Sequence, residues 1–345
     1  MNIPNVSIIM PCYNEEKFIS RAIESLADDY VRQHAEILVV DGQSSDDTLG
    51  VVKGFIDQGF PVKILENEYR RQCFGMNQGI LAAQGEIIVR VDAHSYYPEG
   101  YVKKLVELLE QTDAVNVGGI MLPIFDTPVQ QAVALAMQHP IGVGDAKFHL
   151  GNYKGYVDTV YLGAFKKEVF ETVGLYDTRC RTNEDAELNI RLLKAGKKIY
   201  LDSSIHVEYR PRESFAKLAA QYYHYGRGRA YTTVKHRLFT SYRQAAPPLL
   251  VLALAGSLIA GIFNPLILLT WACYVLAIQA AALFTWRKRH IPFNIRLLMG
   301  IAFMTMHISW GTGFLSFFIV PTAKPLKNTP AQPKHTQHTQ AQSTP

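Results

Sequence analysis

Two long stretches without a charged residue most constrain how this chain can fold. No Asp, Glu, Lys or Arg occurs from Gln244 to Trp286, or again from Leu297 to Ala323. Crossing ~30 Å of hydrocarbon takes about 20 helical residues, so uncharged stretches of this length predict membrane helices rather than core helices of a soluble protein. The residues before them must then form a separate domain.

The first uncharged stretch is interrupted by Asn264-Pro265, a dipeptide typical of turns. We therefore expect a hairpin or re-entrant leg at residues 249–263, a span at 266–286 and a further span at 297–320. The basic loop at 287–289 is expected to stay in the cytoplasm. Lys324 and Lys327 disfavour a tail on the outer side of the membrane, so the side on which the tail lies stays open. These patterns predict a multi-pass protein of the inner membrane with its first domain in the cytoplasm.

Residues 6–91 alternate between short apolar strands and helices. This alternation predicts an α/β domain with a Rossmann-like, mixed but mainly parallel sheet that has helices on both faces. Further along, we expect helices at 99–111 and 183–195, and strands at 114–118 and 199–201. The segments expected within residues 6–91 are strands at 6–10, 36–40, 62–65 and 86–91, and helices at 15–26, 46–58 and 75–84.

We expect three regions along the chain. Residues 1–243 form the α/β domain, of which 205–243 is a Tyr- and Arg-rich juxtamembrane segment, and residues 244–321 form a membrane domain of two to three helices. The tail at 322–345 is rich in Pro, Thr and Gln and is expected to be disordered. The net charge of +5 gathers beside the apolar stretches, which favours membrane lipids over nucleic acid as a partner.

The strand at 86–91 runs directly into Asp92-Ala93-His94. Ligands bind at the carboxyl ends of parallel strands, and in an extended backbone alternate side chains point the same way. Asp92 and His94 could therefore hold one divalent cation, which would neutralise a diphosphate. The alternative is that Asp92 caps the next helix and His94 is an ordinary loop residue.

Polar residues at three other positions suggest chemistry. The turns that begin at Pro11 and at Asp41 follow the first two strands and suit a base and a ribose, although such residues also cap helices. Asn183-Glu184-Asp185 opens a helix, where the helix dipole favours acidic residues; a general base is the functional interpretation. His206 follows the strand expected at 199–201 and offers a second imidazole.

In this order, the motifs resemble the family 2 glycosyltransferases, which are inverting enzymes with a GT-A fold. The resemblance covers about residues 5–230, and the segments 6–15 and 39–48 are similar to the family's two nucleotide-binding turns. It implies a nucleotide diphosphate sugar as the donor, with UDP favoured by family habit. It also implies that the following residues contact the nucleotide: Pro11, Tyr13, Glu15, Asp41, Arg71, Asn77 and Asp92.

Asp92-Ala93-His94 takes the place of the family's Asp-x-Asp metal motif. The final His is shared by a subgroup resembling the glucosyltransferases of succinoglycan assembly, and related enzymes add a later His. The resemblance thus implies Mn²⁺ or Mg²⁺ as the cofactor, held by Asp92, His94 and His206; an imidazole suits Mn²⁺ better. Glu184 and Asp185 match the family's catalytic pair, which makes Asp185 the expected base.

The segment Gln221-Tyr222-Tyr223-His224-Tyr225 takes the place of the Gln-x-x-Arg-Trp motif of processive synthases, but the Arg and Trp are absent. This departure favours the addition of a single sugar. A membrane-bound member would act on a saccharide linked to a polyprenyl diphosphate, although the same segment could serve only as an anchor. The residues expected to bind this acceptor and its diphosphate are Gln221, His224, Tyr225, Arg227 and Arg229.

The resulting hypothesis is a membrane-anchored inverting glycosyltransferase. Two alternatives stay open: a polyprenyl-phosphate sugar synthase, which loads the bare lipid phosphate, and a non-catalytic membrane scaffold that keeps the fold as a binding module. A dinucleotide-dependent oxidoreductase is disfavoured because no Gly-x-Gly-x-x-Gly follows the first strand.

Overall fold

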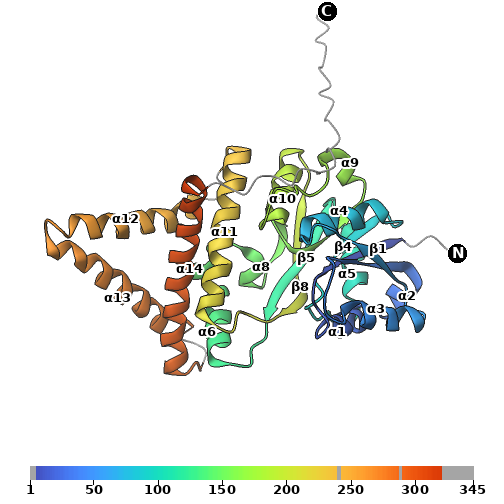
Figure 1. Ribbon diagram of the computed structural model, residues 1–345, viewed down its shortest axis with the longest axis horizontal. Coiled ribbons are helices and arrows are strands. Elements are labelled where there is room, and N and C mark those ends of the chain that lie inside the picture. The colour runs from blue at the N-terminus through green and yellow to red at the C-terminus, as the bar shows by residue number, and fades with distance from the viewer. Residues whose placement is uncertain (1–4, 239–241, 287–289, 321–345) are drawn as a thin grey trace, which may run out of the picture.

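The computed structural model describes residues 5–238, 242–286 and 290–320. A sheet with flanking helices forms one end of the molecule, and a pair of helices projects from the other (Figure 1). The strands are β1 (Val6–Cys12), β2 (Ala35–Asp41), β3 (Val62–Glu66), β4 (Ile87–Arg90), β5 (Asn116–Pro123), β6 (Lys154–Val157), β7 (Tyr161–Lys166) and β8 (Ile199–Tyr209).

Fourteen α-helices and two short 3₁₀-helices are assigned within the described residues. They are α1 (Ile19–Leu26), α2 (Asp29–His34), α3 (Thr48–Asp57), α4 (Gln72–Ala82), α5 (Tyr101–Gln111), α6 (Pro128–Met137), α7 (Pro140–Val143), α8 (Lys147–Leu150), α9 (Val169–Val173), α10 (Glu184–Lys194), α11 (Phe215–His236), η1 (Tyr242–Ala245), α12 (Ala246–Ala260), η2 (Pro265–Leu268), α13 (Leu269–Phe284) and α14 (Phe293–Ile319).

The strands form one mixed sheet in the order β3-β2-β1-β4-β7-β5-β8-β6. Strands β3, β2, β1 and β4 are parallel, β7 runs antiparallel between β4 and β5, and β8 is parallel to β5. The carboxyl ends of β1, β2 and β4 therefore open on one edge of the sheet. This topology confirms the predicted α/β class with a mainly parallel sheet.

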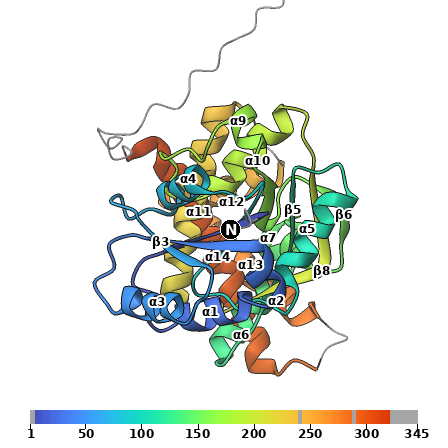
Figure 2. The same ribbon diagram turned by 90° about the vertical axis from the view of Figure 1, so that its right-hand side faces the viewer.

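Apolar side chains on both sides of β1 and β2 explain why the centre of the sheet is buried. On one face, Val6, Ile8 and Met10 pack with residues of α1, α3 and α5. On the other face, Ile9 and Leu38 pack with residues of α4, α9 and α10. Figure 2 shows these helices above and below the sheet. Helices on both faces are typical of a parallel sheet.

Two strand ends differ from the prediction. Strand β4 ends at Arg90, and residues 92–94 lie in a turn, so the extended backbone expected for Asp92 and His94 is wrong. Strand β8 continues to Tyr209 and contains His206, which was expected to follow the strand. The register of β8 on β5 shifts between Gly118 and Ile120. This bulge lets β8 continue as a long strand beyond the predicted end.

Helix α14 packs lengthwise on α11 through glycine contacts. A Cβ atom on Gly226 of α11 would lie 1.9 Å from the Trp310 carbonyl oxygen, and one on Gly313 of α14 would lie 2.0 Å from the Tyr223 carbonyl oxygen. Glycine is required at such positions because the two backbones touch. Figure 1 shows α11 and α14 side by side, between the sheet and the projecting helices.

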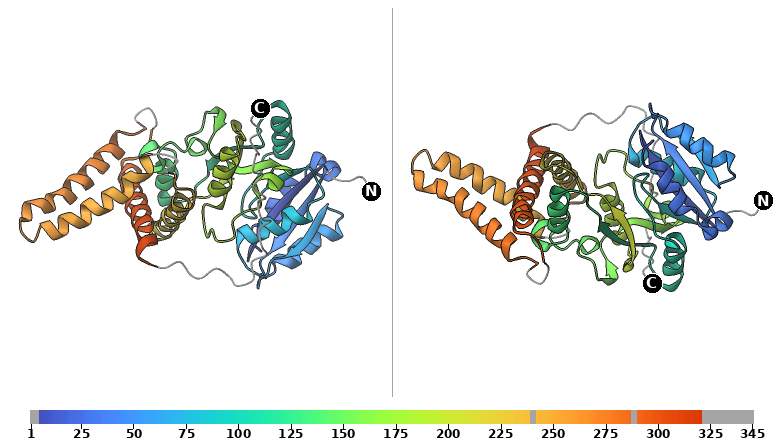
Figure 3. Two further views of the ribbon diagram at one scale, coloured as in Figure 1. Left: turned by 90° about the horizontal axis from the view of Figure 1, so that it is seen from above. Right: turned by 90° about the horizontal axis from the view of Figure 1, so that it is seen from below.

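Helices α12 and α13 form a hairpin that projects from the rest of the molecule in both views of Figure 3. The break between them lies at the predicted position, because Asn264 caps η2 through the Leu266 N–H. Within the part of the chain that the structure describes, two helices are long and apolar enough to cross a membrane: Pro265–Phe284 and Phe293–Ile319. Their most apolar 18-residue windows are 6% and 44% buried, respectively. Almost none of the Pro265–Phe284 window is therefore buried, whereas nearly half of the Phe293–Ile319 window is buried inside the protein.

Replacing Gly226 by Ala should weaken the contact between α11 and α14. In a helix, Gly→Ala normally stabilises by about 1 kcal/mol, but overpacking against the Trp310 carbonyl should cost about 1–3 kcal/mol. Gly54→Ala in α3 is the matched control, since nothing lies within 4 Å of its added methyl. In detergent, we expect Gly226→Ala to unfold at a lower temperature than the parent protein and Gly54→Ala not to. Equal melting temperatures for the two variants would contradict the contact.

Candidate active site

Arg90, the last residue of β4, lies between three carboxylates. Its side chain is 6% exposed, and its guanidinium hydrogen-bonds Asp185 through Nη1. Its Nη2 atom lies 3.3 Å from a Glu184 oxygen and 3.9 Å from an Asp92 oxygen. Glu184 and Asp185 begin α10. One buried cation thus joins the predicted metal motif to the predicted catalytic pair.

Asp185 has the properties of a general base. Burial raises its pKa, Arg90 opposes the rise and the Glu184 carboxylate adds to it, which leaves the pKa of Asp185 at about 7. A carboxylate with a pKa near the working pH is suited to accept a proton. The side chain still has 35% of its surface exposed, so an acceptor can reach it.

Helix α11 fixes the loop that carries this carboxylate. The Thr182 hydroxyl donates to the His224 carbonyl, and the Asn183 side-chain amide donates to the Tyr225 carbonyl, each at 2.9 Å. Asn183 has a positive φ of 61°, which starts α10 from a left-handed residue. Gly228 allows the close approach, since a Cβ there would lie 2.4 Å from the Thr182 hydroxyl. The segment predicted to bind the acceptor therefore lies beside the predicted catalytic pair.

The two predicted nucleotide-binding turns hold each other at the carboxyl ends of β1 and β2. The Glu15 N–H donates to the Thr48 hydroxyl at 2.8 Å, and the Asn14 N–H donates to the Ser44 hydroxyl at 2.9 Å. Asp41 is buried and accepts from both the N–H and the hydroxyl of Ser44. In this structure Asp41 shapes its own turn; its contact with a nucleoside remains a prediction.

Asp92 and His94 also have protein partners. The Gln72 amide donates to Asp92 Oδ1 at 3.0 Å, and His94 Nδ1 lies 3.0 Å from Glu15 Oε1. The hydrogen bond to Glu15 raises the pKa of His94, against burial and the nearby Arg212. His94 therefore connects the metal motif to the first nucleotide turn.

The third predicted ligand, His206, does not complete a metal site. Among residues 5–238, 242–286 and 290–320, no group of three or more His, Cys, Asp or Glu side chains is placed to hold a metal ion. His206 lies within β8, opposite Ile120 of β5. A cation at Asp92 and His94 would take its remaining ligands from water or a substrate. That fits Mg²⁺, which binds one or two carboxylates together with substrate phosphates, and Mn²⁺, which accepts imidazole as well.

Three of the remaining nucleotide predictions stay open. Tyr13 is 44% exposed, with the Arg70 guanidinium 5.6 Å from its ring centroid. Arg71 precedes the first turn of α4. Asn77 binds the backbone of Tyr176, to which its amide donates at 2.9 Å and from which it accepts at 2.8 Å. Asn77 thus holds the loop before α10, and its contact with a base or phosphate stays a prediction.

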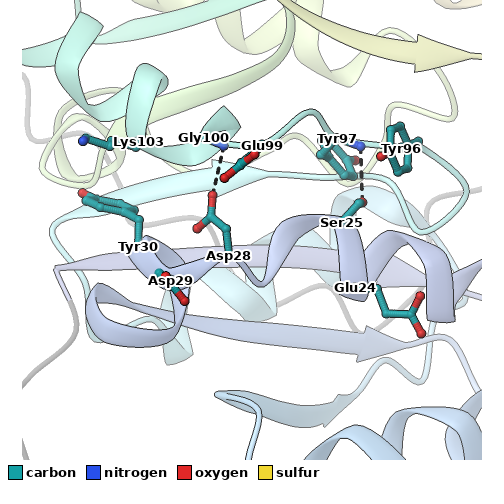
Figure 4. Close-up of a pocket in the computed structure, with 10 residues that line it drawn as sticks. All are labelled: Glu24, Ser25, Asp28, Asp29, Tyr30, Tyr96, Tyr97, Glu99, Gly100 and Lys103. Atoms are coloured by element: carbon teal, nitrogen blue, oxygen red, sulfur yellow. Dashed lines mark hydrogen bonds between the residues drawn. The ribbon is translucent and has the colours of Figure 1, made fainter.

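Pro11 and the turn after β4 have clear structural roles. Pro11 packs against the backbone of Gly75 at the start of α4. The Tyr97 hydroxyl hydrogen-bonds the backbone of Asp92, at 2.7 Å to its N–H and 3.0 Å to its carbonyl. Figure 4 shows that the Tyr97 N–H donates to the Ser25 hydroxyl of α1. Both residues line a pocket of about 580 Å³. None of the predicted site residues lines this pocket; its polar groups brace the turn.

The predicted acceptor residues on α11 have different environments. The Gln221 amide donates to the Tyr225 hydroxyl at 2.9 Å, whereas its buried Oε1 atom has no hydrogen-bond partner among the described residues. The His224 side chain is exposed. Burial lowers the pKa of Arg229, and Asp158 opposes that shift. Arg227 donates to the carbonyls of Ser316 and Val320, so it caps the end of α14; its contact with a diphosphate stays a prediction.

Arg90 is the central residue that the sequence motifs did not reveal. The available signal was a single charged residue inside the apolar segment 87–91. A buried charge must be paired, so Arg90 indicated that a carboxylate would lie near. Which carboxylate could not be inferred, because Asp185 is 95 residues away in the chain.

Replacing Arg90 by Met should leave three carboxylates near each other without a counter-charge. Removing one partner of a buried pair typically costs about 3–5 kcal/mol, whereas Lys103→Met, which breaks a surface pair with Glu107, should cost at most about 1 kcal/mol. Denaturant unfolding measures both.

The loss in Arg90→Met should also shrink as the pH falls. Unpaired buried carboxylates have raised pKa values in the folded state, so proton uptake at low pH favours the folded form. Arg90→Lys, which keeps the charge, should recover part of the stability. A loss that stays the same between pH 8 and pH 5 would argue against the carboxylate cluster as its cause.

A family model described as Glycosyl transferase family 2 matches residues 7–174, which include both turns, Arg90 and the Asp92–His94 motif. The chain is 32% identical over 309 residues to the succinoglycan biosynthesis protein ExoA of Rhizobium meliloti (strain 1021), covering 89% of this chain and 93% of that protein. It is also 32% identical over 230 residues to a dolichyl N-acetyl-alpha-D-glucosaminyl phosphate 3-beta-D-2,3-diacetamido-2,3-dideoxy-beta-D-glucuronosyltransferase of Methanococcus voltae, covering 64% of this chain and 71% of the relative.

Two solved structures share the fold at low sequence identity. The mannosyltransferase PcManGT from Pyrobaculum calidifontis, in complex with GDP-Man and Mn²⁺, superimposes with a TM-score of 0.56 at 20% identity, covering 89% of this chain and 86% of that one. Residues 1–349 of TarS from S. aureus, in complex with UDP-GlcNAc, give a TM-score of 0.51 at 15% identity, covering 91% and 92%. Together with the extensive match to a family relative, the site geometry leads to one conclusion: the chain belongs to glycosyl transferase family 2 and is a glycosyltransferase.

Proposed function

We propose that this protein is a membrane-anchored inverting glycosyltransferase of the cytoplasmic face of the cell membrane. It transfers one sugar from a nucleotide diphosphate sugar, with a UDP-sugar as the first candidate, to a saccharide carried on a polyprenyl diphosphate. The observation that carries the proposal is the Arg90 cluster, which joins Asp92 on the donor side to Asp185 on the acceptor side.

Asp185 is the proposed base. As the acceptor oxygen forms its bond to the anomeric carbon, Asp185 takes the hydroxyl proton. The bond from that carbon to the diphosphate breaks, and the nucleoside diphosphate leaves with the electron pair. Attack from the face opposite the leaving group inverts the configuration, so an α-linked donor gives a β-linked product. Arg90 holds Asp185 and Glu184 in place for this step.

Asp92 and His94 are the proposed protein ligands of a divalent cation, Mn²⁺ or Mg²⁺. When bound, the cation offsets the negative charge that builds on the leaving diphosphate. Glu15 orients His94 through its hydrogen bond, and Gln72 orients Asp92. The PcManGT complex, which holds Mn²⁺ together with its nucleotide sugar, supports this choice of metal.

The lipid-linked acceptor is supported by two observations. The name of the Methanococcus voltae relative gives it a dolichyl-linked sugar phosphate as acceptor and a β-linked product. In this chain, the buried Oε1 atom of Gln221 can accept a hydrogen bond, and exposed His224 lies on the same helix beside the Asp185 loop. We propose that Gln221, His224, Tyr225 and Arg229 contact the acceptor sugar and its diphosphate. The missing Arg-Trp of the processive motif supports addition of a single sugar.

Replacing Asp185 by Asn should lower kcat by roughly 10²–10⁴-fold, because the proton-transfer contribution is lost. The control is Asp57→Asn, an exposed position in α3. For the parent protein, kcat/KM should rise with pH and level off above about 7, since only ionised Asp185 accepts a proton. Initial rates of nucleotide diphosphate release at several pH values measure both. Near-parental turnover of Asp185→Asn would refute the base assignment.

Removing divalent cations should abolish transfer and weaken nucleotide binding. With EDTA-treated protein, calorimetry should show UDP binding that depends on added Mn²⁺ and that Asp92→Asn loses. Because the pKa of His94 is raised by Glu15, protons should compete with Mn²⁺ at low pH, so Mn²⁺ affinity should fall as the pH falls. Asp57→Asn again serves as the control. UDP binding and turnover that ignore the chelator would contradict the metal role.

The function is tested by a donor and acceptor screen in isolated membranes. UDP- and GDP-sugars are supplied with either a lipid diphosphate-linked saccharide or the bare lipid monophosphate, and products are identified by mass. Transfer to the saccharide supports the proposal. Transfer only to the monophosphate would identify a polyprenyl-phosphate sugar synthase, and neither transfer nor donor hydrolysis would identify a non-catalytic scaffold.

A further inference from the structure

The hairpin of α12 and α13 presents apolar side chains to its surroundings on nearly every side. Within α12 only Pro248, Leu254 and Ser257 are buried, and within α13 only Ala282. At the tip, Ile262 is 78% exposed and Phe263 is 87% exposed. Contiguous apolar surface of this size marks an interaction site, and the absence of any charge from residue 244 to 286 fits hydrocarbon as the occupant.

Several polar groups of the hairpin have partners inside it, as hydrocarbon favours, and Tyr274 and the Gln279 amide N–H pair with α14. The Trp271 indole N–H donates to the Ser257 hydroxyl at 3.1 Å, and the Ser257 hydroxyl donates to the Leu254 carbonyl at 2.7 Å. The Thr270 hydroxyl donates to the Ile267 carbonyl at 2.8 Å. These bonds favour acyl chains over water as the environment of the tip.

Both ends of the hairpin are attached to α14. At the entry, the Pro247 carbonyl lies against Gly311, where a Cβ would approach it to 2.4 Å. At the exit, the Arg296 guanidinium donates to the carbonyls of Leu283 and Thr285, which end α13. Both ends of the hairpin therefore lie against α14.

Helix α14 cannot cross a bilayer without taking α11 with it. The two helices run parallel, with Gly313 on Tyr223 and Arg227 capping the end of α14. Helix α11 is 22 residues long, or about 33 Å. Its charged side chains run from Lys217 to Lys235, and placing such groups in hydrocarbon is costly.

Helix α11 is in turn locked to the sheet domain. The Lys235 ammonium pairs with two buried carboxylates, Asp177 and Glu187, and His236 Nε2 lies 3.0 Å from Glu187. Arg191 and Arg179 complete these pairs from α10 and the loop before it. Removing Lys235 from this network would leave buried charge behind, which holds α11 and α14 outside the hydrocarbon.

We propose that residues 246–284 enter a bilayer as a re-entrant hairpin, entering and leaving through the face on which the catalytic domain sits, while α14 lies along that face. The proposal rests on the membrane attachment of the proposed function. The 15 residues of α12 measure about 22 Å, less than the ~30 Å of a full crossing. In place of the predicted multi-pass arrangement, the protein is monotopic. In the sequence, basic residues flank the hairpin, such as Arg243 and Arg287, and basic residues beside an apolar segment favour anionic lipid headgroups.

The test is cysteine accessibility in sealed proteoliposomes of phosphatidylethanolamine and phosphatidylglycerol. Cys273, the exposed native cysteine, is first replaced by Ala. Single cysteines are then introduced at Ile262 in the tip, at Ile319 near the end of α14 and, as the domain control, at Lys53 in α3. A charged, membrane-impermeant maleimide is added outside, and then again after the vesicles are opened with detergent.

A monotopic protein gives one pattern. The fraction of Ile319→Cys labelled from outside equals the fraction of Lys53→Cys labelled from outside. Ile262→Cys takes up roughly ten-fold less label until detergent is added, because hydrocarbon excludes the charged reagent. Labelling of Ile262→Cys or Ile319→Cys from the opposite side would overturn the proposal by showing a crossing. Labelling of Ile262→Cys from the same side, with release of the protein by alkaline carbonate, would overturn it by showing that a second copy or water covers the hairpin.

Transfer activity of the same variants in detergent separates the two hypotheses. Active variants with a crossing topology would disprove the re-entrant hairpin and leave the proposed transferase intact. If the parent protein is inactive but shows the monotopic labelling pattern, the re-entrant hairpin stands and the proposed transferase function is disproved.

Discussion

The buried guanidinium of Arg90 is the interaction on which the rest of the site depends. It sits at the end of a central strand and contacts Asp92 in the following turn and both acidic residues that begin α10. Without it, three carboxylates would repel one another in a partly buried space. With it, the donor-side motif and the proposed base are held together before any substrate arrives. Electrostatic preorganisation of this kind is commonly the largest contribution to enzymatic rate.

Local patterns predicted much of the fold, and long-range pairing escaped them. Strands β1, β2 and β4 were found because short apolar runs between helices are visible in the sequence itself. Strands β6 and β7 were missed because they pair antiparallel with partners distant in the chain. The end of β8 was misplaced because β8 resumes its pairing with β5 at His206, after a register shift between Gly118 and Ile120 of β5. A sequence shows a strand's own pattern but not its neighbour.

The same distinction explains which site residues could be predicted. Glu184 and Asp185 stood out because acidic residues at a helix start form a short motif, and Asp92 and His94 because they follow a strand. The protein partners of Asn77 and Arg227 could not be predicted, because Tyr176 and the end of α14 lie about 90 to 100 residues away. Arg90 was passed over because its three carboxylates come together only in the folded chain.

Helix α11 has a consequence for which acceptors can be used. Gly226 and Gly228 are two residues apart and so face opposite sides of the helix: one touches α14 and the other touches the loop of the proposed base. Helix α11 thus lies between α14 and the loop of the proposed base and contacts both. Under the proposed membrane attachment, α11 would set the distance between the lipid surface and the proposed base. An acceptor glycan would then be extended where its growing end reaches that distance from the membrane.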